Sequence, residues 1–336
     1  MSKVIESVKR IIQDEDPKAV YDTISHELSQ TYDQYMGIEF LPPEFEPELK
    51  GAYFFKENHF LALSKLRIIQ AFIVARRILN QHLNQPGSVL TDDVWKATNV
   101  LLLWDSEHLT AANTRKRLIL NSSLTETERK EALEKDAYFI NSLLSSDLYR
   151  HTKSPVLWSH KRWLFRQERQ AQMPLNLVQD FESVIHLAAD RHPMNYYAWS
   201  YARSLFSSRS GEWDPETVQR FVEMSHKWCR LHLNDTSGWS FLIVVAAEFP
   251  QHAKEIFQET ATLAKRYGWR GEAIWNFLRT LVLLPVLREN VEVTKGFRDV
   301  YSSVRGEILQ QDEASWDATV LDRCAKWVDT AVSRGT

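Results

Sequence analysis

The sequence is poor in the residues that interrupt helices. Glycine occurs 10 times and proline 11 times in 336 residues. Both residues are common at the many turns of a β-rich protein, and both are disfavoured inside helices. Their scarcity argues against a turn-rich β protein and favours a helical one.

Cysteine and excess charge are also scarce. Cys229 and Cys324 are the two cysteines, too few for a disulfide framework, so reduced thiols are expected. Lysine and arginine total 41 against 44 aspartates and glutamates, which gives a net charge of −3. Because this balance creates no basic field, we expect neither a nucleic-acid partner nor binding to an anionic membrane.

Long apolar runs are missing as well. The longest, near residues 241–247, is far shorter than the roughly 20 residues that a transmembrane helix needs. The first residues, MSKVIESVKRIIQDED, predict an amphipathic helix over 4–12 and do not resemble a signal peptide. We therefore expect no transmembrane segment and a cytoplasmic location.

Helical patterns cover most of the chain. They include a long helix from about 59 to 83 and a final helix over 316–332. Residues 37–51 contain several prolines and glycines and predict an extended loop. No stretch predicts a β-strand, so the predicted fold class is all-α.

Two helix starts are marked by capping signals. Thr125 and Glu128 form a capping-box pattern before a leucine-rich segment. Asp214 is followed by Pro215, the pattern of an N-cap with proline at the first helical position.

Tryptophan recurs at nearly constant spacing. Separations of 41, 40 and 36 residues divide four of the tryptophans: Trp158, Trp199, Trp239 and Trp275. Ala112 holds the same register 46 residues before the first of them. Repeats of about 40 residues, each two helices long, are typical of an α-solenoid. We expect an α–α superhelix, a crescent of helical hairpins, over 59–336, with its clearest repeats in 90–290, after a helical extension and loop over 1–58.

Arginine follows three of these tryptophans by four residues. The pairs are Trp158/Arg162, Trp199/Arg203 and Trp275/Arg279. Residues four apart share one face of a helix. We interpret these tryptophans and arginines, together with Trp239, as residues that hold neighbouring repeats together.

Two of the repeats carry a family resemblance. SPVLWSHKRW at 154–163 and NYYAW at 195–199 resemble the repeats of protein prenyltransferase α subunits, whose pattern is Asn-Tyr, two residues, Trp, two residues, Arg. Three residues stand where that pattern has arginine: Ala202, Leu242 and Leu278. Such degenerate repeats are most similar to the divergent α-subunit-repeat-containing branch of the family.

The resemblance implies a function. The branch serves as the α subunit of the type III geranylgeranyltransferase, an enzyme that is inactive without its β subunit. In the family the β subunit supplies the Zn²⁺ and most of the lipid pocket, and zinc makes the substrate cysteine a thiolate. The implied co-substrates are a prenyl diphosphate and a protein with a C-terminal cysteine. This chain itself is expected to hold neither metal nor cofactor.

Lys153 is the candidate catalytic residue. It stands five residues before Trp158, where the family pattern Lys-Asn-Tyr-x-x-Trp has a lysine near the diphosphate leaving group. Ser154 and Pro155 replace the asparagine and tyrosine of that pattern. Lys161, inside the following helix, is a basic residue that offers a comparison.

Four further residues are predicted at the seam with the β subunit and the substrate. Asn195 and Tyr196 match the Asn-Tyr of the pattern, and Tyr197 stands where the family often has histidine. His160, two residues after Trp158, is interpreted as a seam or packing residue.

A metal site is not expected in HKWCRLH. His226 and His232 point in directions that differ by about 120°, at about 100° per residue of a regular helix. Cys229 lies between them.

Two other functions stay open. The chain could be a non-catalytic α-solenoid scaffold, although tetratricopeptide repeats have a shorter period of about 34 residues. It could also be the α subunit of a farnesyl- or Rab-directed prenyltransferase.

Overall fold

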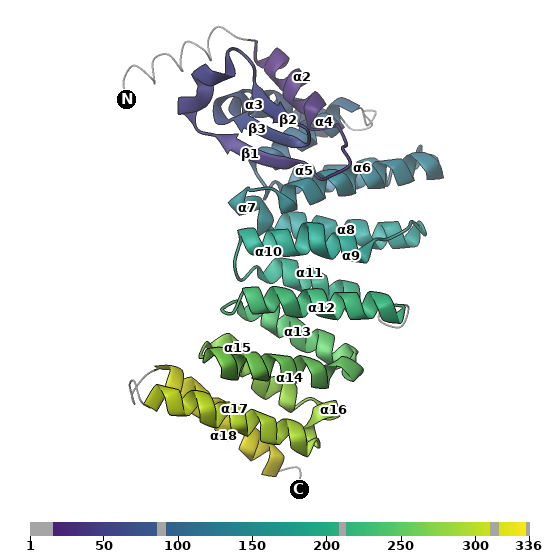
Figure 1. Cartoon of the computed structure of the whole chain (residues 1–336). Helices are drawn as coiled ribbons and strands as arrows, with labels where there is room; N and C mark the ends of the chain where they lie inside the picture. The colour runs from purple at the N-terminus through teal and green to yellow at the C-terminus, as the bar shows by residue number, and fades with distance from the viewer. Residues whose placement is uncertain (1–15, 86–91, 208–212, 310–315, 334–336) are drawn as a thin grey trace. The chain divides into compact units, whose positions relative to one another are not determined.

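The computed structural model (Figure 1) describes four stretches of the chain: 16–85, 92–207, 213–309 and 316–333. The chain forms two compact units, Met1–Tyr201 and Ala202–Thr336, which we describe separately. The predicted amphipathic helix over 4–12 lies outside the described residues. The predicted crescent concerns both units together and stays a prediction.

Helices dominate the first unit. Its α-helices are α2 Pro17–Glu27, α3 Lys65–Asn84, α4 Asp92–Trp104, α5 Leu109–Ile119, α6 Glu126–Ser145, α7 Tyr149–Thr152, α8 Pro155–Gln170, α9 Leu177–Asp180 and α10 Leu187–Arg191. A π-helical segment, η2 (Phe181–His186), joins α9 to α10. Helix α11, Tyr196–Ser207, begins in this unit.

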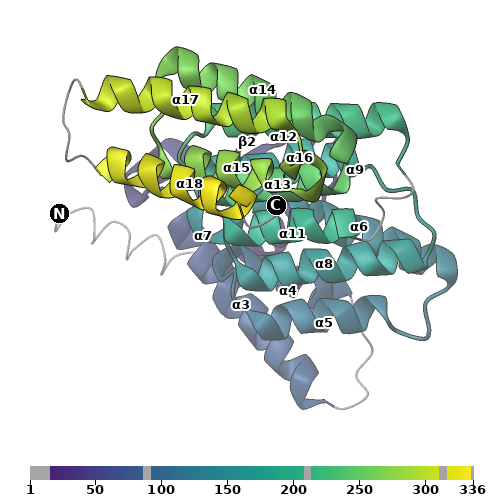
Figure 2. The ribbon, with the colours of Figure 1, turned by 90° about the horizontal axis from the view of Figure 1, so that it is seen from below.

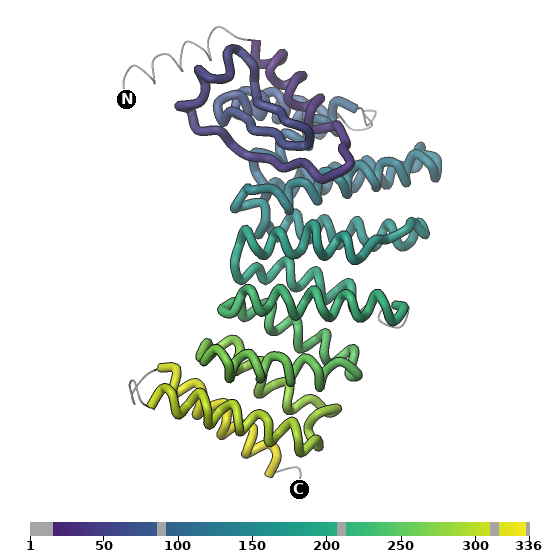
Figure 3. The backbone as a smooth tube through the Cα atoms, viewed as in Figure 1, coloured from purple at the N-terminus to yellow at the C-terminus, as the bar shows by residue number. Residues whose placement is uncertain are grey.

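The described part of the second unit consists of helices and their connections. The helices are α12 Pro215–Leu231, α13 Thr236–Glu248, α14 Pro250–Tyr267, α15 Glu272–Val282, α16 Pro285–Arg288, α17 Val291–Leu309 and α18 Trp316–Ser333. Helices α14 and α17 lie side by side (Figure 2). The backbone trace shows α12 to α15 as successive hairpins (Figure 3). The predicted all-α class is confirmed.

The first unit also contains a small three-stranded sheet. Its strands, in the order β1-β3-β2, are β1 Gly37–Leu41, β2 Phe54–Glu57 and β3 Phe60–Ser64. Strand β3 pairs parallel with β1 and antiparallel with β2. A 3₁₀ helix, η1 (Pro43–Leu49), lies between β1 and β2. The predicted boundary between residues 58 and 59 falls in the turn that joins β2 to β3.

This sheet corrects three predictions. Strands occur in a chain for which no strand was predicted. Residues 37–51 are not an extended loop, and α3 begins at Lys65 rather than near residue 59. In β3, alternate side chains such as Leu61 and Leu63 are buried, as the two-residue period of a strand requires. The apolar spacing of so short a segment is ambiguous between strand and helix, and its partner β1 lies far back in the sequence.

Both predicted capping signals are confirmed. In a capping box at the start of α6, Glu128 N donates to Thr125 Oγ1 at 3.2 Å and Thr125 N donates to Glu128 Oε2 at 2.8 Å. Asp214 caps α12 by accepting from Thr217 N at 2.9 Å, and Pro215 is the first helical residue. These bonds satisfy amide groups that the first helical turn leaves unpaired.

The four repeat tryptophans are buried, each 1% exposed or less: Trp158, Trp199, Trp239 and Trp275. Trp158 Nε1 donates to Thr152 O at 2.8 Å. Trp275 Nε1 likewise donates to Trp269 O at 2.8 Å. In both repeats the accepting carbonyl lies six residues before the tryptophan, so the repeat register produces the same contact in each unit.

Two of the repeat arginines contact the next repeat. Arg162 Nη1 donates to Ser200 Oγ at 3.2 Å within the first unit. Arg203 Nη2 donates to Ser240 Oγ at 3.2 Å within the second. In each case the serine directly follows the next tryptophan, so the contact is made at equivalent places.

Candidate functional site

Lys153 lies in a short turn between two helices. Helix α7 ends at Thr152, and Ser154 is the N-cap of α8, accepting from Leu157 N at 3.1 Å. Ser154 Oγ also donates to Ser106 O at 2.8 Å. The Lys153 side chain is half-buried, and its ammonium group has no hydrogen bond or ion pair with any described residue. The positive end of α8 lies beside this free charge.

Asn195 supports this turn. Its Nδ2 donates to Thr152 O at 2.7 Å and to Ala188 O at 3.2 Å, and its Oδ1 accepts from Ala198 N at 3.2 Å. Asn195 is completely buried. The structure therefore brings Asn195 and the turn of Lys153 together, although they lie some forty residues apart. Asn195 does so from inside the protein and does not itself face a partner.

Exposed aromatic and apolar side chains flank the turn. Tyr149 is 66% exposed and stacks on His192, with ring centroids 4.2 Å apart. Tyr196 is 61% exposed and Met194 51% exposed. We name Lys153, Tyr149, His192, Met194 and Tyr196 the Lys153 edge. Large exposed aromatic and apolar side chains gathered in one place are typical of a protein-binding surface.

Further basic groups lie on α7 and α10, which are in contact. Arg150 is exposed and Arg191 is half-buried, and neither has an ion-pair partner among the described residues. His151 adds no charge, because burial lowers its pKa to about 4, and its Nε2 bonds to Leu103 O at 2.9 Å. The unpaired cations favour an anionic ligand near the Lys153 edge.

Tyr197 lies just behind the exposed edge. Its side chain is half-buried, and its ring centroid lies 5.7 Å from that of Tyr196.

Arg279, in the second unit, places its guanidinium over the Trp327 ring, 4.5 Å from the centroid. This arginine therefore links α15 to α18 by a cation–π contact in place of the serine contact of the other two.

His160 is a packing residue, one of the two roles expected of it. It is fully buried, with Nε2 2.7 Å from Asp136 Oδ2. Asp136 Oδ1 accepts from Arg115 Nε at 2.7 Å. Burial alone would raise the pKa of Asp136, but the nearby Arg115 and His160 outweigh it and hold that pKa below its usual value. His160 belongs to a buried ion-pair cluster that links consecutive repeats.

A second buried cluster repeats this arrangement. Lys161 Nζ lies 2.6 Å from Asp180 Oδ1, and Tyr201 Oη donates to Asp180 Oδ2 at 2.7 Å. Burial disfavours the charged form of Lys161, yet Asp180 and Glu168 outweigh it and raise the pKa of Lys161 above its ordinary value. Lys161 is therefore unsuitable as a solvated comparison for Lys153.

The two clusters occupy equivalent repeat positions. Arg115 and Lys161 lie three residues after Ala112 and Trp158, where the family pattern has arginine. The basic residue at this position could be recognised in the sequence. Its acidic partner could not, because it lies on the second helix of each repeat and belongs to no recognised motif. The pairs could therefore not be identified before the helices were placed.

The described residues offer no site for a metal ion built from three or more histidine, cysteine or acidic side chains. His226 Nε2 bonds to Thr260 Oγ1 at 2.8 Å. His232 stacks on Trp228, with centroids 3.9 Å apart, and Cys229 is buried. The three residues of HKWCRLH have separate partners and surroundings.

No membrane-spanning candidate occurs among the helices of the described residues, since none of them is both long and apolar enough.

Comparison with known protein families gives one domain match. Residues 156–267, about a third of the chain, match the ECM9 middle domain. Protein ECM9 of Saccharomyces cerevisiae is 24% identical over 193 residues, which cover 56% of this chain and 49% of that protein.

Vertebrate relatives are similar over an overlapping share of the chain. Protein prenyltransferase alpha subunit repeat-containing protein 1 of Homo sapiens is 27% identical over 167 residues, 45% of this chain and 39% of the relative. Protein prenyltransferase alpha subunit repeat-containing protein 1-B of Xenopus laevis is 27% identical over 235 residues, 62% of this chain and 52% of the relative. The chain thus spans about two fifths to one half of the relatives that it matches. As its Trp-centred motifs predicted, the chain is related to the protein prenyltransferase α-subunit repeat-containing proteins.

Proposed function

We propose that this chain is the α subunit of a heterodimeric protein prenyltransferase that transfers a geranylgeranyl group to a protein cysteine. The observation that carries the proposal is the Lys153 edge, where an unpaired lysine sits on a turn that buried Asn195 holds from behind. The names of the relatives support an α-subunit role. In this proposal the heterodimer works in the cytoplasm.

The β subunit would bind at the Lys153 edge. Tyr149, Met194 and Tyr196 present apolar surface there, and burying such surface in a permanent complex is favourable. Zinc and most of the lipid pocket would belong to the β subunit, whose metal would make the substrate cysteine a thiolate. The residues of this chain would supply the contact surface and positive charge.

Lys153 would act on the leaving group. Negative charge grows on the diphosphate as the bond between the prenyl carbon and oxygen breaks. An ammonium group placed there stabilises the transition state more than the ground state. Lys153 is suited to this because no described acidic residue neutralises it, and the N-terminus of α8 adds favourable potential.

Lys153→Ala in the purified heterodimer tests the proposal. Single-turnover kcat should fall about ten- to a hundred-fold, or ~1.4–2.7 kcal/mol. Heterodimer stability should change little, because the Lys153 side chain has no described partner. Lys153→Arg should recover part of the rate, since it keeps the charge.

The matched control is Lys135→Ala. Lys135 is an exposed lysine of the same unit, on α6, and it has no ion-pair partner among the described residues. It should leave kcat unchanged. Equal rates for wild type and Lys153→Ala, in a heterodimer that forms normally, would contradict a catalytic role for Lys153.

A scaffold without catalysis is the second candidate. One observation favours it: Pro155, the first residue of α8, occupies the position of the family tyrosine and offers no hydroxyl. In that case Tyr149→Glu, which places a negative charge on the exposed edge, would abolish complex formation, whereas Lys153→Ala would leave the complex and any prenyl transfer by the β subunit unchanged. Identification of the co-purifying β subunit, with assays on farnesyl and geranylgeranyl diphosphate, separates the geranylgeranyl, farnesyl and Rab-directed alternatives.

A further inference from the structure

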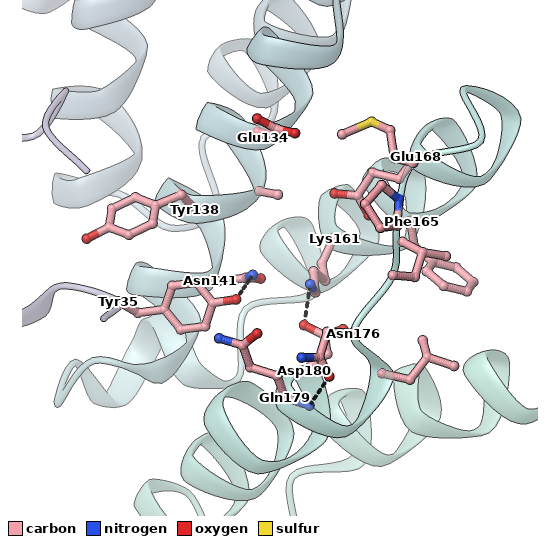
Figure 4. A pocket seen from close by; sticks show the side chains of 15 residues that line it. Tyr35, Glu134, Tyr138, Asn141, Lys161, Phe165, Glu168, Asn176, Gln179 and Asp180 are labelled. Carbon is pink, nitrogen blue, oxygen red and sulfur yellow. Dashed lines mark hydrogen bonds and ion pairs between the residues drawn. The ribbon is translucent and has the colours of Figure 1, made fainter. Parts of the chain in front are cut away.

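A small polar pocket lies in the first unit, away from the Lys153 turn. Its walls come from α6, α8, α9 with the segment that leads into it, and Tyr35 (Figure 4). Its volume is about 250 Å³. This is smaller than the roughly 300–1,000 Å³ of sites for drug-sized ligands, so it suits a compact head group.

Asn141 leaves a buried acceptor in this pocket. The residue is 4% exposed, and its Nδ2 donates to Tyr35 Oη at 2.9 Å. Its Oδ1 has no hydrogen-bond partner among the described residues. Buried polar atoms are rarely left unpaired. A carbonyl oxygen can only accept, so the missing partner must carry an N–H or O–H donor.

The pocket also carries an excess of negative charge. Three carboxylates, those of Glu134, Glu168 and Asp180, line it with the ammonium of Lys161. Lys161 and Asp180 form an ion pair with each other. Burial is the main cause that raises the pKa of Glu168; Lys161 lowers this pKa, and Asp180 and Glu134 raise it. Glu168 thus shares Lys161 with Asp180, and with three carboxylates around one ammonium an anionic ligand would be repelled.

Aromatic rings provide part of the remaining walls. Tyr35 and Tyr138 lie with ring centroids 5.7 Å apart, and Phe165 lines the pocket from α8. The faces of aromatic rings attract organic cations. Their presence favours an ammonium or guanidinium group over a hydrated metal ion.

We propose that this pocket binds an organic cation with N–H donors, an ammonium or guanidinium head group, through Asn141 Oδ1 and Glu168. The head group could come from a lysine or arginine side chain of a protein or from a free polyamine. This function is independent of prenyl transfer and of the Lys153 edge.

Isothermal titration calorimetry on the full chain, without a β subunit, tests the proposal. The probes are an acetylated Gly-Arg-Gly amide, the same peptide with citrulline, and spermidine. The arginine peptide or spermidine should bind at one site, and their relative affinity separates a protein source from a polyamine source. The citrulline peptide should bind at least ten-fold more weakly, because it lacks the charge.

Two variants locate the site. Glu168→Gln should weaken binding of the cation at least ten-fold, while Glu131→Gln, an exposed glutamate on α6 that does not line the pocket, should not. Asn141→Leu should also weaken binding, and circular dichroism would check that it folds. Absence of binding by both cationic probes, equal binding of arginine and citrulline peptides, or unchanged affinity in folded Glu168→Gln would each overturn the proposal.

Discussion

The two units build similar helix pairs around different cores. In the first unit, the positions two and three residues after Trp158 are polar. They supply His160 and Lys161 after Trp158, which bond to the buried carboxylates of Asp136 and Asp180. Each carboxylate joins side chains from two consecutive repeats.

In the second unit the same positions are apolar. Two residues after Trp239 comes Phe241, and two after Trp275 comes Phe277, whose ring lies 4.8 Å from that of Trp239. Phe241 packs edge-on against Phe221, with centroids 6.3 Å apart. Apolar burial of this kind needs no exact charge partner and tolerates adjustment better than an ion pair.

The polar core and the apolar core are suited to different roles. Buried ions cost desolvation energy, so they persist only where every partner is in place. The polar core of the first unit leads directly to the charged pocket beside Lys161 and Glu168. Around its repeat tryptophans the second unit packs aromatic side chains edge-on or tilted, which serves stability. We therefore expect the first unit to carry the more specific chemistry.

The largest expected effect comes from breaking a polar cluster. Asp136→Ala would leave Arg115 and His160 buried without their acid, and should cost about 3–5 kcal/mol of unfolding free energy. Chemical denaturation followed by circular dichroism would measure it. Asp329→Ala, which removes an exposed partner of Arg298, should cost about 0–1 kcal/mol. Equal losses of unfolding free energy in the two variants would contradict a stabilising role for the buried Asp136 cluster.

Acid should weaken both units, which limits the contrast between them. Burial lowers the pKa of His151 and of His226 to about 4. Both values lie below the unfolded value of about 6.5, so each neutral ring stabilises the fold at pH 7 and loses this contribution as the pH falls. From pH 7 to pH 5 the loss is about 2 kcal/mol per histidine.

Denaturation of wild type and His226→Gln at pH 7 and pH 5 would check this acid effect. The variant should be less stable at pH 7, because it loses the packed ring and its bond to Thr260. Its stability should change less with pH than that of the wild type. If the unfolding free energy changed equally between pH 7 and pH 5 in both proteins, His226 would not be a source of the acid effect.

A smaller difference should separate two tryptophans. Trp158→Phe removes ring volume and the hydrogen bond to Thr152 O. Trp239→Phe removes volume alone, because Trp239 Nε1 has no partner among the described residues. The first variant should therefore be the less stable by about 1 kcal/mol, measured as the difference in unfolding free energy. A larger loss for Trp239→Phe would show that packing dominates the hydrogen bond.

The smallest effects concern a contact that both units share. Ser200→Ala removes the acceptor of Arg162 in a half-buried place and should cost about 0.5–1.5 kcal/mol. Ser240→Ala removes the acceptor of Arg203 in an exposed place and should cost less than about 0.5 kcal/mol, since water replaces the contact. Thermal denaturation of both single variants would resolve the order. A larger loss of stability for Ser240→Ala than for Ser200→Ala would mean that burial does not decide the strength of these serine contacts.

The sequence by itself determined the helices and their repeat. Helix caps such as Thr125 with Glu128, and the periodic burial of tryptophan, depend on residues close in the chain. Propensity, capping and amphipathic period act over a few residues, so they can be recognised without a structure. The family resemblance singled out Lys153 and Asn195, and the structure places Asn195 against the turn that carries Lys153.

Only the tertiary structure decided the sheet, the buried ion pairs and the pocket. Strand β1 pairs with β3 across a segment that contains prolines, and Asp136 meets Arg115 and His160 from different helices. Such contacts depend on where distant segments pack, and the free energy of a buried charge depends on every neighbour around it. For that reason the sequence left His160 with a choice of seam or packing role, while the folded chain buries it beside Asp136, which belongs to no recognised motif.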